Sequence, residues 1–185
     1  QLGMSWAGAI VWDDIRSAEF VAGLPEVDPE RIGAMGLSMG SHRTWNLTAA
    51  SDRVRVGAAI CWMGDTATLM EPGNNQTKGY SAFSMIHPGL RNELDYADVA
   101  AIACPKPMLF YNGDQDALFP VAGVQEAYRK MRAVWQSRQA DDRLVTKIWP
   151  VPHEFNRDMQ EEAFSWLDRY LHPDHANAAT ADDRN

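Results

Sequence analysis

Apolar residues recur along this chain in two patterns, one with the spacing of a helix face and one in short, nearly continuous runs. Three segments have the helical spacing: residues 6–24, a segment that includes residues 124–135, and residues 158–171. Their apolar stripes are Val11, Ile15, Ala18 and Ala22, then Val124, Tyr128, Met131 and Trp135, and finally Met159, Ala163, Trp166, Leu167 and Tyr170. Each segment is therefore predicted to be an amphipathic helix that covers a core.

The short apolar runs predict strands at residues 31–35, 54–61, 107–111 and 144–149, with a further helix from residue 41. Continuous runs suit parallel strands that are covered on both faces, and strands alternating with helices predict an α/β fold with a mostly parallel sheet. Residues 62–103 interrupt this alternation of strands and helices and are predicted to pass over the C-terminal edge of the sheet. One domain, residues 1–171, is expected, followed by a polar, disordered tail at 172–185.

Composition narrows the possible partners. The chain has 185 residues and a formal net charge of −8, with no basic cluster, which argues against nucleic acid. No apolar run has the length of a transmembrane helix, and no signal-peptide pattern opens the chain, so its compartment is not determined. Cys61 and Cys104 lie in apolar surroundings and are predicted to be buried thiols rather than a disulfide or a metal site. Nothing in the sequence indicates a cofactor.

The segment with the clearest chemistry is Gly36-Leu37-Ser38-Met39-Gly40, a G-x-S-x-G pattern between a predicted strand and a predicted helix. A serine at such a tight turn projects its hydroxyl away from the backbone. Both glycines are expected to be needed because side chains there would collide with the neighbouring elements. An ordinary glycine-rich turn is the alternative interpretation.

A nucleophilic serine needs a base, and the base needs a carboxylate to orient it. Asp114 and Asp116 follow the third predicted strand, and His153 follows the fourth. The carboxyl ends of parallel strands meet at one edge of a sheet, so these residues are predicted to approach Ser38. The order serine, aspartate, histidine is that of the α/β-hydrolase triad.

These motifs resemble the α/β-hydrolases, in particular the branch of dienelactone hydrolases and acetylxylan-esterase-like serine esterases. The resemblance rests on residues 28–32, the 36–40 turn, the loop Gly113-x-x-Asp116-x-x-x-Pro120 and His153 ahead of the last helix. It implies Ser38 as the nucleophile, Asp116 as the acid and His153 as the base. Asp114 stays a rival acid, as does Asp65, because some related esterases place their acid after the preceding strand.

Further site residues follow with less support. The backbone amide of Met39 is expected to donate to the oxyanion. Trp62, Met63 and Phe119 lie beyond strand ends and are candidates to line a substrate pocket, although they could equally seal the core. Of the other histidines, His42 is expected to pack or cap, and His172 and His175 to be solvated. His87 is expected to be a surface-loop residue, with contact to the substrate as the alternative.

The resemblance also shows what this chain does not contain. Such enzymes have several strands before the serine turn and a loop that supplies a second oxyanion donor, and neither precedes Ser38 here. We therefore expect the exposed strand edge to be covered by another segment, another chain or a second copy. The predicted activity is hydrolysis of a small ester through an acyl-enzyme. The alternatives are a peptidase of the prolyl-oligopeptidase type and a catalytically silent assembly module.

Overall fold

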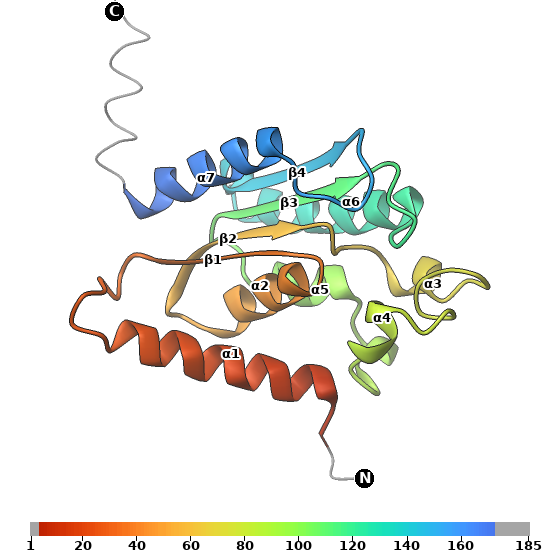
Figure 1. Cartoon of the computed structure of the whole chain (residues 1–185), viewed down its shortest axis with the longest axis horizontal. Coiled ribbons are helices and arrows are strands. Elements are labelled where there is room, and N and C mark those ends of the chain that lie inside the picture. Colours follow the sequence, from red (N-terminus) through yellow and green to blue (C-terminus); the bar gives the residue numbers. More distant parts are fainter. Residues whose placement is uncertain (1–3, 173–185) are drawn as a thin grey trace, which may run out of the picture.

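A four-stranded parallel sheet forms the centre of the computed structural model, which describes residues 4–172 (Figure 1). The strands are β1 (Ile32–Leu37), β2 (Val54–Ile60), β3 (Met108–Gly113) and β4 (Leu144–Trp149), and they follow one another in the order β1-β2-β3-β4. The predicted α/β fold with a parallel sheet is thus confirmed, and each strand boundary lies within two residues of its predicted place. His175 and nearly all of the tail predicted to be disordered lie outside the described residues.

Helices cover both faces of this sheet (Figure 1). Helix α7 (Arg157–Leu171) packs on one face, where Met159 and Ala163 join Ala58 and Ile60 in a buried cluster. The opposite face carries α1 (Trp6–Ala22), α2 (Met39–Ala50) and α6 (Val121–Ser137), whose core also takes up Ala59. Alternate residues of β2 therefore point to opposite faces, as strand geometry requires, and both faces are buried.

The segment between β2 and β3 contains only short helices: α3 (Thr66–Leu69), α4 (Ser81–Ser84), the 3₁₀ turn η1 (Leu90–Asn92) and α5 (Tyr96–Ala101). A second 3₁₀ turn, η2 (Asp141–Arg143), precedes β4. The insertion is held by buried polar contacts, since Asn75 donates to the carbonyl of Leu118 at 3.2 Å and accepts from the amide of Ala82 at 3.0 Å. It is therefore fastened to the loop that follows β3, next to the predicted acid.

The β1 side of the molecule is apolar and uncovered. As an edge strand, β1 leaves Met35 and Leu37 each 40% exposed, and on the outer face of α1 the exposed fractions are 61% for Trp12 and 70% for Phe20. Asp14 of α1 is buried instead and pairs with Arg43 of α2, which ties the two helices together. None of the helices within residues 4–172 combines the length and hydropathy that crossing a bilayer requires.

Candidate active site

Ser38 occupies a sharp turn between the edge strand β1 and α2. Its backbone has φ 57° and ψ −118°, a conformation that costs free energy for any residue with a side chain. Two backbone bonds hold it there: the Ser38 amide donates to Ile60 at 2.8 Å, and the His42 amide donates to the Ser38 carbonyl at 3.2 Å. The turn therefore has the strained geometry of a nucleophile elbow, with a half-buried serine at its apex.

The two glycines of the pentapeptide differ in what they do. A Cβ at Gly36 would lie 2.3 Å from the carbonyl carbon of Gly40, so only glycine fits at position 36. A Cβ at Gly40 would meet nothing within 4 Å. The expected need for glycine at both positions is right for Gly36 and wrong for Gly40, because the first turn of α2 faces open space at that point.

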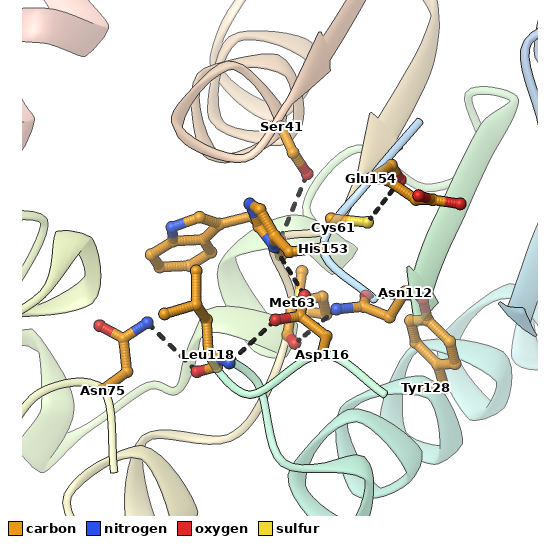
Figure 2. A network of polar contacts seen from close by, with 11 residues as sticks. Ser41, Cys61, Met63, Asn75, Asn112, Asp116, Leu118, Tyr128, His153 and Glu154 are labelled. Atoms are coloured by element: carbon orange, nitrogen blue, oxygen red, sulfur yellow. Dashed lines mark hydrogen bonds and ion pairs between the residues drawn. The ribbon is translucent and has the colours of Figure 1, made fainter. Parts of the chain in front are cut away.

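Asp116 and His153 meet although they follow different strands (Figure 2). Nδ1 of His153 lies 2.7 Å from Oδ2 of Asp116, and the amide of Leu118 donates to Oδ1 at 2.9 Å. The Asp116 side chain is fully buried, whereas that of His153 is 25% exposed. A buried carboxylate thus orients an imidazole that keeps one side open to solvent or substrate. Within residues 4–172, no hydrogen bond joins the Ser38 side chain to His153.

The loop that carries His153 is placed by β3. The amide of Asp114 donates to Trp149 at 2.8 Å and that of Gln115 donates to Val151 at 3.1 Å. A Cβ at Gly113 would lie only 2.1 Å from the carbonyl oxygen of Val151, so the loop crosses the end of β3 directly above this glycine. That close crossing brings His153 to Asp116.

Neither rival acid contacts His153. Asp114 is exposed, and its backbone rather than its carboxylate forms the contact described above. Asp65 caps the N-terminus of α3, where its carboxylate accepts from the amide of Thr68 at 2.5 Å and from the hydroxyl at 3.0 Å. Asp116 is therefore the one of the three predicted acids whose carboxylate the fold brings to the histidine.

The other histidines have different surroundings. His42 is fully buried between Trp45 and Trp62, with ring centroids 4.7 and 4.5 Å away, and this burial lowers its pKa to about 3. His87 is half-buried, its ring lies 6.3 Å from that of His42, and burial also lowers its pKa. The exposed His172 lies 3.2 Å from the guanidinium of Arg31. None of these three occupies the position of His153 beside Asp116.

Cys61 lies beside Asp116 and His153, whereas the sequence predicted it only as a buried thiol. Its thiol lies against the carbonyl of Glu154 at 3.3 Å, and its sulfur, a carboxylate oxygen of Asp116 and a ring nitrogen of His153 all lie within 4.8 Å of one another (Figure 2). Burial, followed by the charge of Asp116, raises the pKa of this thiol to about 12, so it stays protonated. The signal that could have found Cys61 is its place directly after β2, the same strand-end position that pointed to Asp116 and His153.

The remaining predicted residues lie around this site. Met39 begins α2, and amides in the first turn of a helix have no partner within the helix. Trp62, Met63 and Phe119 are fully buried, and the ring of Phe119 stacks on His153 with centroids 6.2 Å apart. Contact of these side chains with a substrate stays a prediction.

Both cysteines are free, Cys61 buried as expected and Cys104 only partly buried.

A parallel sheet with helices on both faces, a strained serine at a strand-to-helix turn and an Asp–His pair after later strands define an α/β-hydrolase-type protein. The chain matches the dienelactone hydrolase family over residues 4–184, and it belongs to that family.

The chain is also similar to a known bacterial protein and, in its fold, to solved structures. YtaP of Bacillus subtilis (strain 168), provisionally named a hydrolase, is 27% identical over 164 residues, which is 89% of this chain and 54% of YtaP. Among solved structures, a carbohydrate esterase family 15 glucuronoyl esterase from Caldicellulosiruptor kristjansonii superposes with a TM-score of 0.73 at 16% identity, over 92% of this chain and 51% of that one. Acetyl xylan esterase 1 from Thermoanaerobacterium sp. superposes with a TM-score of 0.63 at 20% identity, over 88% of this chain and 52% of the esterase chain. The chain thus spans about half the length of these proteins.

Proposed function

We propose that this chain carries the catalytic residues of a serine esterase that works through an acyl-enzyme, with Ser38 as nucleophile, His153 as base and Asp116 as the residue that orients His153. The observation that carries the proposal is the 2.7 Å contact between Asp116 and His153 in a chain whose serine occupies a strained elbow. Family membership and the likeness to esterase structures support the same chemistry. A small carboxylic ester, on a carbohydrate or another alcohol, is the proposed substrate.

In this mechanism Oγ of Ser38 attacks the ester carbonyl and transfers its proton to Nε2 of His153. The Nδ1–H group of His153 donates to Asp116, which fixes the tautomer and stabilises the imidazolium. His153 then gives the proton to the departing alkoxide, and the alcohol leaves. Water next attacks the acyl-enzyme, again with His153 as base, and releases the acid. The missing contact between Ser38 and His153 is compatible with this scheme, because such bonds are often long before substrate binds.

The oxyanion of the tetrahedral intermediate is proposed to accept a hydrogen bond from the backbone amide of Met39. One such donor is worth about 10²–10³ in kcat, and a second is usual. We propose that further strands pair with the open edge of β1 and supply the second donor, either from another segment, from another chain or from a second copy. The exposed Met35 and Leu37 on this strand support that arrangement, since apolar strand edges are normally covered.

Hydrolysis of p-nitrophenyl acetate by the wild type and by Ser38→Ala, compared with Ser41→Ala as the matched control, tests the proposal. The hydroxyl of Ser41 is buried and donates to the carbonyl of Trp62 at 3.3 Å, so the control removes a nearby serine that lies outside the proposed triad. We expect turnover to disappear in Ser38→Ala alone. Full turnover in Ser38→Ala would refute the nucleophile. Cleavage of aminoacyl-proline anilides in place of esters would favour a peptidase.

A further inference from the structure

Asn75 is a buried residue of the insertion whose side chain reaches the acid loop, residues 114–120, which carries Asp116 (Figure 2). Asn75 is 1% exposed, and both ends of its amide are used: the oxygen accepts from the amide of Ala82 at 3.0 Å, and the nitrogen donates to the carbonyl of Leu118 at 3.2 Å. A flipped amide would set N–H against N–H and oxygen against oxygen, so the two partners fix its orientation. Asn75 thus joins the insertion to the acid loop through a fully paired side chain.

The residue that Asn75 holds leads directly to the proposed triad. The amide of Leu118 donates to Oδ1 of Asp116 at 2.9 Å, and Oδ2 of Asp116 lies 2.7 Å from Nδ1 of His153. Leu118 is therefore held at its carbonyl by Asn75 and itself holds the carboxylate with its amide. A displacement of Leu118 would move the carboxylate of Asp116 away from the ring of His153.

The two halves of the acid loop are held by different parts of the chain. Ahead of the acid, the amide of Gln115 donates to the loop after β4 at 3.1 Å, whereas Leu118, beyond the acid, is bonded to the insertion. The insertion is attached to the rest of the fold a second time, because the amide of Asp65 donates to Gly123 of α6 at 3.2 Å. Loss of the Asn75 side chain should therefore release Leu118 while the insertion stays in place.

We propose that Asn75 is a positioning residue for the reaction at Ser38, and that it fixes the carboxylate of Asp116 against His153 through Leu118. This assignment rests on the proposed function, because the role is defined by proton transfer at His153. Displacing a catalytic group by about 1 Å can cost about 10² in rate, even when the substitution lies far from the reacting atoms. The insertion then contributes to catalysis as well as covering the edge of the sheet.

The first test compares turnover of p-nitrophenyl acetate in Asn75→Ala and in Asn74→Ala, the matched control. The side chain of Asn74 also donates to a carbonyl, that of Thr68 at 2.7 Å, but this bond stays within the insertion. We expect Asn75→Ala to lower kcat about tenfold and leave KM unchanged, the effect of one lost hydrogen bond that leaves a buried carbonyl unpaired. Asn74→Ala should change kcat less than about twofold. An unchanged kcat in Asn75→Ala, or equal losses in the two variants, would overturn the proposal.

A double-mutant cycle separates positioning from a general loss of order. In an Asp116→Asn background, Asn75→Ala should lower kcat less than about threefold, because the carboxylate that Asn75 positions is already gone. The same tenfold loss in both backgrounds would overturn the proposal. Asn75→Asp is the second variant, since it keeps the shape of the side chain and the acceptor for Ala82. At alkaline pH its ionised carboxylate has no proton to donate to Leu118, and the same fall in kcat is expected.

Proton NMR of the Nδ1–H group of His153 needs no turnover and therefore tests the positioning independently of the proposed function. The signal is assigned by its absence from His153→Ala. We expect it in the wild type and in Asn74→Ala, and we expect exchange with water to weaken it in Asn75→Ala. An unchanged signal in Asn75→Ala would overturn the proposal. A wild type that has no turnover, but whose signal depends on Asn75, would contradict the proposed function and support the hold of Asn75 on the pair.

Discussion

Replacing Asp116 by asparagine removes the charge that faces His153 and keeps the size of the side chain. At the observed separation of 2.7 Å and an effective dielectric constant of about 20, the attraction between the carboxylate and an imidazolium amounts to about 6 kcal/mol. Part of this is offset by the cost of burying the carboxylate, and an amide oxygen can still accept one hydrogen bond. We therefore expect kcat to fall by about 10³–10⁴, since each factor of ten corresponds to about 1.4 kcal/mol.

The assay compares kcat for p-nitrophenyl acetate in Asp116→Asn and in Asp114→Asn. Asp114 lies two residues away and is exposed, so its variant removes the same charge at a position without contact to the histidine. We expect less than a threefold change there. A larger loss in Asp114→Asn than in Asp116→Asn would refute the reasoning, because the acid would then be the rival carboxylate. Thermal unfolding of both variants checks that the fold is kept.

Three further predictions concern stability and assembly. Gly36→Ala should lower the free energy of unfolding by about 3 kcal/mol, because the added methyl group would overpack against the backbone. Gly40→Ala should leave the free energy of unfolding unchanged or raise it slightly, because a methyl group there meets open space. Equal effects of the two substitutions in thermal melts would contradict this difference in space. His42 has a pKa of about 3 when folded and about 6.5 when unfolded, so the stability it contributes is present above pH 6.5 and is lost as the pH falls. Between pH 7 and pH 4 this loss should amount to about 3 kcal/mol, and His42→Phe should flatten the pH dependence in urea titrations where His172→Gln does not. Phe20→Lys should reduce self-association in sedimentation velocity if a second copy covers α1, and an unchanged sedimentation profile would argue against that occupant.

Much of the fold could be predicted because apolar periodicity reports burial directly. The stripe of α6 is an example: Val124, Tyr128, Met131 and Trp135 have helical spacing, and all four are buried. The sequence also predicts that Ser38, Asp116 and His153 lie at one edge of the sheet, because each follows a strand and the carboxyl ends of parallel strands meet at the same edge. These inferences need no knowledge of which side chains touch.

Contacts between distant segments could not be obtained in this way. The choice between Asp114 and Asp116 depends on how the loop after β4 crosses Gly113, which is a tertiary contact. The burial of His42 depends on Trp62 and on the insertion, and the insertion has no apolar periodicity from which its packing could be predicted. The freedom at Gly40 was missed because the motif suggests close packing on both sides, whereas the start of α2 faces open space.

The most direct test of the central claim is to label the folded chain with a fluorophosphonate probe and locate the adduct by mass spectrometry of the tryptic peptides. The account predicts one adduct, on Ser38, that is absent from Ser38→Ala and forms at least a hundredfold more slowly in His153→Ala. No adduct on the folded wild type, or an adduct on another serine with Ser38 unmodified, would contradict it.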